Sequence, residues 1–294
     1  MSCLMKFKWV KIPRNIMPEG NGILLDYIRA YSAAAITKGT IRYCQYENEV
    51  EEGMWAGGRV GLKSIFREKT TSAALDSLKR MASFGILTYK YSPDTKFLSY
   101  QIRESYRIKN KKRGLPVQCE NTYGFVHVPR NVPDRLAAQG YVFEDADAWI
   151  DLWCHTVSGD NGNVFSFIQP CVQFSSTEPT LTLDTLAHRW NWTKSKTRRF
   201  LARNSAYFKL YKLPGSYGCV IFNPGYDDFR GAKTLSETQI LIVCKYLQKY
   251  GKNRRSVMTD RAHFCILVNK YTRKLIALFY TENRVSLSFI YDRY

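Results

Sequence analysis

The chain has 294 residues, of which 44 are Lys or Arg and 25 are Asp or Glu, so its formal net charge is +19. This length allows two or three domains with cores of their own, and the excess of positive charge favours a partner rich in phosphate or carboxylate groups. No stretch approaches the roughly 18 uninterrupted apolar residues of a membrane-spanning helix, and the eight cysteines include no C-x-x-C pair, so we expect a cytoplasmic protein with reduced cysteines and no membrane segment.

A short segment of the chain occurs twice. The sequence WVKIPRNI at residues 9–16 returns as FVHVPRNV at residues 125–132, and a helix-forming run follows each copy. Proline disfavours a helix at the residue before it, so each copy is expected to begin in an extended segment. We interpret the repetition as a duplicated domain.

The first copy is predicted over residues 1–102. Apolar residues recur at helical spacing in residues 23–31 and predict its first helix. The glycine-rich stretch at residues 53–58 is expected to form a loop. A short helix at residues 62–67 follows this loop.

A second helix in the first copy follows the start signal Thr70-Thr71-Ser72. Two strand-like runs, at residues 86–91 and 96–102, then flank the turn sequence SPDT. A helix, a turn, a second helix and a β-hairpin in this order describe a winged helix.

Residues 103–122 are predicted to be a basic linker, with six basic residues and one acidic residue between Arg103 and Arg113. As a solvated linker the segment needs no function. In a DNA-binding protein it would cross a phosphate backbone and add affinity without specificity. Its candidate phosphate contacts are Lys109, Lys111, Lys112 and Arg113.

The second copy is predicted over residues 123–230 and repeats this plan. Its first helix is expected at residues 146–157. The further elements are a short helix, a candidate recognition helix and a two-stranded wing, expected at residues 183–190, 193–204, and 207–213 with 219–222. The fold class is therefore α+β, with two tandem winged-helix (helix-turn-helix) domains.

Residues 231–294 are predicted to form a C-terminal appendage. An amphipathic helix is expected at residues 235–250, followed by three β-like runs at residues 264–268, 275–280 and 285–291. We expect this segment either to pack on the second copy or to mediate self-association.

The candidate recognition helix separates its apolar and basic residues. A helical wheel places Thr197, Phe200 and Leu201 in one sector, whereas Ser195, Lys196, Arg199 and Arg203 lie opposite. Thr193 is a natural N-cap. One face can thus pack on the domain while the other enters a major groove, although a solvated basic face is the alternative.

The equivalent helix of the first copy is a weaker candidate. It carries Lys79 and Arg80, but the helical wheel also places Asp76 on the outward face, where a carboxylate would repel a phosphate-lined groove. We expect the second copy to dominate binding, and the first copy to bind DNA weakly or to contact protein.

Four stretches of the second copy carry a family resemblance: the F-x-x-x-P-R motif at residues 125–130, the Trp-containing helix at 149–152, L-x-x-L-A at 183–187 and WNWTKSKTRRFL at 190–201. Together they resemble the winged-helix domain of phage and plasmid replication initiators and replisome organisers. The resemblance covers about a hundred residues of the second copy and, more faintly, the first copy.

The resemblance implies that the DNA-contacting residues are Lys194, Ser195, Lys196, Arg198, Arg199 and Arg203. Two departures from the family pattern are Thr197, in place of an aliphatic core residue, and residues 204–207, in place of a leucine-rich end with glycine. The tandem arrangement also resembles that of iteron-binding plasmid initiators.

The sequence does not favour an enzyme. It has no G-x-x-x-x-G-K-[ST] loop for a nucleotide, and its four histidines are too scattered for the paired-histidine metal site of nickases. Cys154 and His155 are neighbours on a predicted helix, so their side chains point about 100° apart. We expect no catalysis, no cofactor and no metal.

The sequence therefore predicts a specific double-stranded DNA-binding protein. We expect a replication initiator of a plasmid, phage or mobile element that binds origin repeats and recruits host replication proteins, with a homodimer as a further expectation. A transcriptional regulator or a relaxosome accessory protein would use the same contacts. The alternative from another class is a non-catalytic RNA-binding or interaction protein.

Overall fold

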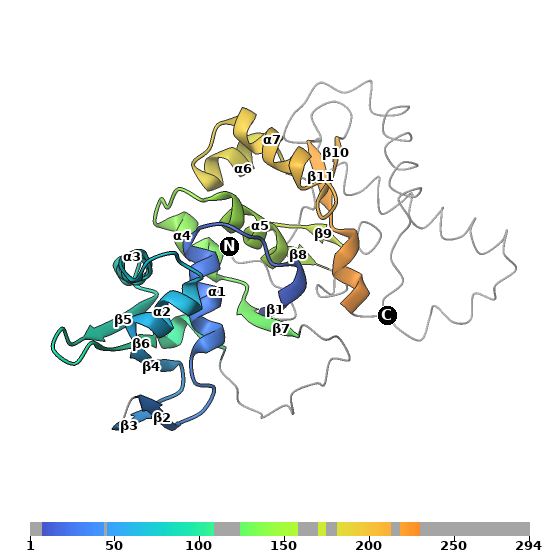
Figure 1. Ribbon diagram of the computed structural model, residues 1–294. Coiled ribbons are helices and arrows are strands. Elements are labelled where there is room, and N and C mark those ends of the chain that lie inside the picture. Colours follow the sequence, from blue (N-terminus) through green and yellow to red (C-terminus); the bar gives the residue numbers. More distant parts are fainter. Residues whose placement is uncertain are drawn as a thin grey trace, which may run out of the picture. The chain divides into compact units, whose positions relative to one another are not determined.

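The computed structural model describes residues 8–43, 46–108, 124–157, 170–174, 181–212 and 218–229, and these form a mixed α+β protein (Figure 1). They fall into two compact units. The N-terminal unit holds the described residues up to His155 together with His188–Trp192, and the C-terminal unit holds those of Thr156–Ala187 and those from Thr193 onward. Within these described ranges, no helix combines the length and apolar character needed to cross a membrane.

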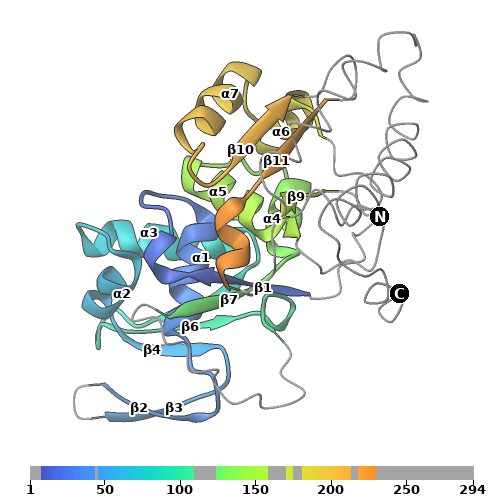
Figure 2. The same cartoon turned by 90° about the vertical axis from the view of Figure 1, so that its right-hand side faces the viewer.

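The two repeated segments form strands that pair with each other. Strands β1 (Trp9–Pro13) and β7 (Phe125–Pro129) are antiparallel neighbours in the N-terminal unit (Figures 1 and 2). Lys11 lies opposite His127, its own counterpart in the repeat, so the pairing has a local pseudo-twofold axis at these two residues. The alternation of a β-strand buries the four aliphatic side chains, which are Val10, Ile12, Val126 and Val128.

The first copy continues through the 3-10 turn η1 (Arg14–Ile16) and helix α1 (Ile23–Ala33). A hairpin that was not predicted follows, with strands β2 (Gly39–Tyr43) and β3 (Tyr46–Val50). The predicted helix at residues 23–31 is confirmed, because α1 spans these residues and buries their apolar side chains, with Tyr31 half-buried.

The predicted glycine-rich loop is wrong, because most of it forms strand β4 (Met54–Gly58). The glycines serve packing in this strand: a Cβ atom on Gly57 would lie 2.7 Å from Cζ2 of Trp55. The absence of a side chain on Gly57 leaves room for the Trp55 indole, which stacks on Tyr100 with ring centroids 5.4 Å apart. Glycine inside a strand thus marks a close approach of a side chain.

Helices α2 (Arg59–Phe66) and α3 (Thr71–Ser83) follow β4, and then come strands β5 (Leu87–Tyr91) and β6 (Phe97–Ile102). The two helices and the hairpin lie where the sequence predicted them. Strand β6 is central in a three-stranded antiparallel sheet of order β4-β6-β5 (Figure 1). Helix α3 ends before Gly85, whose φ of 68° lies in the left-handed region.

The beginning of the predicted linker is folded against the first copy. The 3-10 turn η2 (Glu104–Tyr106) buries Tyr106, whose carbonyl oxygen accepts a hydrogen bond of 2.6 Å from the Tyr27 hydroxyl. The Ile108 amide donates to the Tyr31 hydroxyl at 3.2 Å. Residues 103–108 are therefore attached to α1, and the basic residues of the linker after them lie outside the described residues.

The second copy contributes helices α4 (Val132–Ala138) and α5 (Asp145–Cys154) to the N-terminal unit. Helix α4 was not predicted. The helix predicted over residues 146–157 corresponds to α5, which ends at Cys154, and the next residues form strand β8 (Thr156–Val157). Helix α5 packs against α1 and is buried along most of its length.

The C-terminal unit contains a four-stranded antiparallel sheet of order β10-β11-β9-β8, whose strands are labelled in Figure 1. Its further strands are β9 (Cys171–Val172), β10 (Lys209–Lys212) and β11 (Cys219–Phe222), and the 3-10 helix η3 (Pro224–Phe229) follows. Helix α6 (Leu183–Trp190) contributes residues to both units, and helix α7 (Lys194–Arg203) belongs to the C-terminal unit.

Helices α6 and α7 and the hairpin β10–β11 form where they were predicted. The compact units do not follow the repeat, since the N-terminal unit includes α4 and α5 of the second copy. The predicted division of the chain remains a prediction: two domains at residues 1–102 and 123–230, a linker at 103–122 and an appendage at 231–294. The appendage lies outside the described residues.

Candidate nucleic-acid interface

Helix α7 begins at a side-chain cap. The Thr193 hydroxyl accepts a hydrogen bond of 3.2 Å from the Lys196 amide, and the Thr193 carbonyl accepts one of 3.1 Å from the Thr197 hydroxyl. Thr197 is fully buried. Because the helix backbone itself satisfies its hydroxyl, a threonine is accommodated within the packed face of α7.

The burial of α7 confirms the predicted separation of its faces. Thr197, Phe200 and Leu201 have exposed fractions of 0, 1 and 2%, so they form the packed face. The other predicted contact residues lie on the outside: Lys194, Ser195, Arg198, Arg199 and Arg203 are exposed and Lys196 is partly exposed. The helix thus presents five cations and no carboxylate of its own to solvent.

The first cation of α7 has a weak partner. Lys194 Nζ lies 2.7 Å from Asp184 Oδ1 in the first turn of α6, and both side chains are more than half exposed. An exposed ion pair of this kind contributes about 0–1 kcal/mol, because water and salt screen it. A phosphate group can therefore compete with Asp184 for the Lys194 ammonium group.

Helix α3 offers a different surface, because both of its predicted contact residues are paired with carboxylates. Arg80 Nη2 lies 3.1 Å from Oδ2 of Asp26 in α1, and Lys79 Nζ lies 3.2 Å from Asp76 Oδ1. The Asp26 side chain is 2% exposed, whereas the Arg80 side chain is 41% exposed. The carboxylate beside Arg80 is therefore buried, whereas Asp184 beside Lys194 of α7 is exposed.

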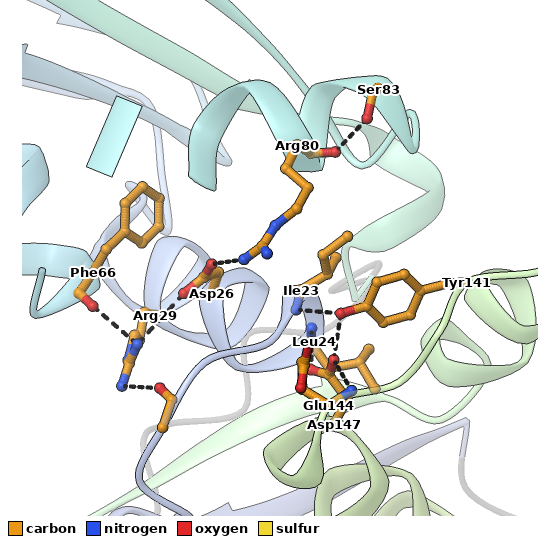
Figure 3. Close-up of polar contacts among 11 residues, drawn as sticks. Ile23, Leu24, Asp26, Arg29, Phe66, Arg80, Ser83, Tyr141, Glu144 and Asp147 are labelled. Atoms are coloured by element: carbon orange, nitrogen blue, oxygen red, sulfur yellow. Dashed lines mark hydrogen bonds and ion pairs between the residues drawn. The ribbon is translucent and has the colours of Figure 1, made fainter. Parts of the chain in front are cut away.

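Asp26 is held by several donors. Burial raises its pKa, and hydrogen bonds from Ser77 and Arg80 and the charges of Arg80 and Arg29 oppose that rise. Arg29 Nη1 lies 3.4 Å from Asp26 Oδ1 and also donates to the Phe66 carbonyl at the end of α2, at 2.9 Å (Figure 3). Asp26 thus links α1 to α3 directly and to α2 through Arg29.

A second buried aspartate connects the two copies. Oδ1 of Asp147 in α5 accepts a hydrogen bond of 2.8 Å from the Leu24 amide in α1 (Figure 3). Its Oδ2 accepts one of 2.6 Å from the Tyr141 hydroxyl, which in turn accepts one of 3.3 Å from the Ile23 amide. Burial raises the pKa of Asp147 to about 6, against these hydrogen bonds.

A third buried aspartate, Asp151, sits in an ionic cluster of the N-terminal unit. Arg189 Nε lies 2.7 Å from Asp151 Oδ2, and the Trp190 indole donates to the same oxygen at 2.7 Å. His155 lies 3.0 Å from both Asp151 Oδ1 and Asp134 Oδ1. Although burial acts in the opposite direction, Arg189 and His155 hold the pKa of Asp151 well below its usual range.

Both ring nitrogens of His155 face carboxylates of this ionic cluster. Burial raises the pKa of Cys154, so this thiol is not activated as a nucleophile. The pKa of His155 is raised despite its burial, because Asp151 and Asp134 face its ring. The cluster therefore fastens the end of α6 to α5.

The buried aspartates were not predicted to be paired groups, although the sequence contains a pattern that indicates them. Asp26 follows Leu25 inside an apolar helical run, and Asp151 follows Ile150 inside another. A carboxylate inside an apolar helix indicates a buried, paired group.

The predicted linker contacts Lys109, Lys111, Lys112 and Arg113 lie outside the described residues. In the ranges that the structure describes, no group of three or more His, Cys, Asp or Glu side chains is arranged to hold a metal ion. Of the predicted residues, the structure brings the six on α7 together on one helix and leaves Lys79 and Arg80 on α3 beside acidic partners. No family model, curated protein or solved structure matches the chain.

Proposed function

We propose that the protein binds double-stranded DNA through helix α7. The observation that carries the proposal is the separation of faces on this helix: Thr197, Phe200 and Leu201 are buried, and the opposite side carries the basic residues, while α7 itself contains no acidic residue. A helix of this kind can stay packed on its domain while its cations enter a groove lined with phosphates.

The arrangement around α2 and α3 supports a winged helix in the first copy. Strand β4 precedes the two helices, the hairpin β5–β6 follows them, and β6 lies between β4 and β5. This is the order of helix, strand, two helices and a paired hairpin that a winged helix requires.

The second copy has a comparable arrangement around its hairpin. Leu181, just before α6, bridges to Cys219 in β11, with backbone N–O distances of 2.8 and 2.9 Å. Strand β10 pairs with the other edge of β11. The segment before the first of the two helices thus pairs with the last strand of the hairpin, as it does in the first copy, and we propose two tandem winged helices.

In this proposal α7 enters the major groove. The capped N-terminus places Lys194, Ser195 and Lys196 where a helix end favours phosphate, and Arg198 and Arg199 extend from the next turn. Arginine can form bidentate hydrogen bonds with guanine, so the arginines would read the base sequence. The lysines would contact phosphates. The hairpin β10–β11 and the basic residues 109–113 would add backbone contacts.

We further propose that the bound DNA is a replication origin with repeated sites, on the resemblance to plasmid and phage initiators. Host replication proteins and a second copy of the chain are the proposed partners. A promoter-binding regulator or a relaxosome protein would present the same helix to DNA, and an RNA-binding protein would place a basic face on RNA.

The first experiment measures binding to duplex DNA as a function of salt. If five to eight phosphates are neutralised, log affinity falls against log salt with a slope of about −5 to −7. The double substitution Arg198→Ala with Arg199→Ala should reduce the slope by about 2 and abolish sequence selectivity. A flat slope in the wild-type protein contradicts the proposal.

A matched control tests whether α7 or overall charge is responsible. Lys38→Ala with Arg42→Ala removes the same charge from exposed side chains at the β2–β3 hairpin. This control should change the slope much less than the pair on α7. Equal losses contradict a specific interface.

Selection of fragments from a sheared library of the encoding replicon or genome then identifies the target. Enrichment of clustered direct repeats supports origin binding, and a single palindrome upstream of a gene supports a regulator. Tighter binding to RNA than to duplex DNA contradicts the proposal.

A further inference from the structure

We propose that Asp26 sequesters Arg80 and thereby prevents helix α3 of the first copy from acting as a second DNA-binding helix. This inference rests on the proposed function of α7. It identifies a carboxylate in α1 as the residue that makes the two copies unequal, which the exposed Asp76 alone does not explain.

Arg80 and Arg203 occupy equivalent places in the two copies. Each follows its N-cap, Thr70 or Thr193, by the same number of residues, and each is exposed on its helix. The two arginines would therefore face DNA in the same way if only the position on the helix mattered.

Helices α1 and α5 both contain buried aspartates, and these have different partners. Asp151 of the second copy is held by Arg189 and Trp190 of α6 and by His155 of its own helix. In the first copy Asp26 pairs with Arg80, which lies on the outward face of α3 (Figure 3). Asp151 is thus neutralised by cations from α6 and from its own helix, whereas Asp26 is neutralised by Arg29 of its own helix and by Arg80 of the expected DNA-facing helix.

The burial of Asp26 makes this pair difficult to break. Its side chain is 2% exposed, so water does not replace the guanidinium group if Arg80 turns to a phosphate. Removing one partner from a buried ion pair is strongly unfavourable, whereas an exposed pair such as Lys194–Asp184 exchanges readily with solvent and salt. Arg80 therefore stays with Asp26, and Lys194 remains available to DNA.

The test is a gain of binding. Asp26→Asn keeps the shape of the side chain and removes its charge, which releases Arg80. Binding to a nonspecific 20-base-pair duplex at low salt should become several-fold tighter, and the salt slope should become steeper by about 1, the value for one added phosphate contact. Adding Arg80→Ala to Asp26→Asn should return both quantities to wild-type values.

Asp76→Asn is the matched control, because it removes a charge from the exposed carboxylate on the same helix. Arg80→Ala in that background should leave binding unchanged. The inference is overturned if Arg80→Ala cancels the gain in affinity of neither variant, or cancels it equally in Asp26→Asn and Asp76→Asn. In either case the gain comes from the change in overall charge.

A second variant does not depend on the stability of Asp26→Asn. Arg80→Ala in the wild-type background should leave the salt slope unchanged, since Arg80 contributes no phosphate contact while Asp26 holds it. A loss of about 1 in the slope overturns the inference. If the wild-type protein binds no duplex, the proposed function itself fails, whereas wild-type binding with an unchanged slope in Asp26→Asn removes the sequestration alone.

Discussion

The carboxylate of Asp147 lies 2.8 Å from the backbone amide of Leu24, so a side chain of the second copy caps the first helix of the first copy (Figure 3). Gly22 at the N-cap position has no side chain that could do this. The first turn of a helix has unpaired amides and a partial positive charge, which a carboxylate satisfies. The two copies are therefore joined by a cap as well as by the pairing of β1 with β7.

Asp147 should make the stability of the protein depend on pH. Its folded pKa of about 6 lies above the ordinary value of 3.8, so the folded protein binds the proton more tightly than the unfolded chain. The resulting stability is full below about pH 4 and is lost as the pH rises through about 6, which amounts to about 3 kcal/mol. Urea unfolding between pH 4 and 7 measures this loss.

Asp147→Asn removes the titrating group and should make the fall in unfolding free energy over this range smaller. His155, with a raised pKa, and Asp134 and Asp151, with lowered pKa values, titrate in both proteins and cancel in the comparison. A fall of the same size in the variant would contradict the assignment to Asp147.

Gly22→Ala should destabilise the protein by about 2 kcal/mol or more. The φ of Gly22 is 152°, which side chains rarely adopt, and a Cβ atom there would meet the Asp147 carboxylate. Gly39→Ala is the control, because a Cβ at Gly39 has no atom within 4 Å. Thermal or urea unfolding should separate the two variants, and equal midpoints would contradict the close packing of Gly22 on Asp147.

Arg189→Met should cost about 3–5 kcal/mol of unfolding free energy. The substitution keeps much of the volume but leaves the fully buried Asp151 without its strongest cation. Lys194→Met removes the exposed ion pair with Asp184 and should cost less than about 1 kcal/mol. Losses of similar size at the two positions would show that the buried cluster contributes no more than a surface pair.

Thr193→Ala should weaken helix α7 by about 1 kcal/mol, because the Lys196 amide loses its acceptor. Under the proposed function, DNA affinity should fall because the helix is less ordered, and Thr193→Ser should restore both the order of the helix and the affinity. Hydrogen exchange of the α7 amides and a binding titration measure the two effects. Affinity that falls without any change in exchange would indicate that Thr193 contacts DNA itself.

The sequence by itself determined the elements whose pattern is local. The limits of α6 and α7, the two hairpins after the helix pairs and the buried face formed by Thr197, Phe200 and Leu201 follow from helical periodicity, N-cap residues and turn residues. The repeat was equally visible, because it compares the chain with itself. These features involve residues that are close in sequence, so tertiary contacts did not override them.

The tertiary structure decided everything that depends on distant partners. The glycine-rich stretch became strand β4 because Gly57 makes room for Trp55 beside β6, which lies far along the chain. The partner of Arg80 is Asp26, and that of Leu24 is Asp147. A sequence shows that such charges exist, but only the packing of α1 on α3 and α5 brings a buried carboxylate within reach of one donor and not another.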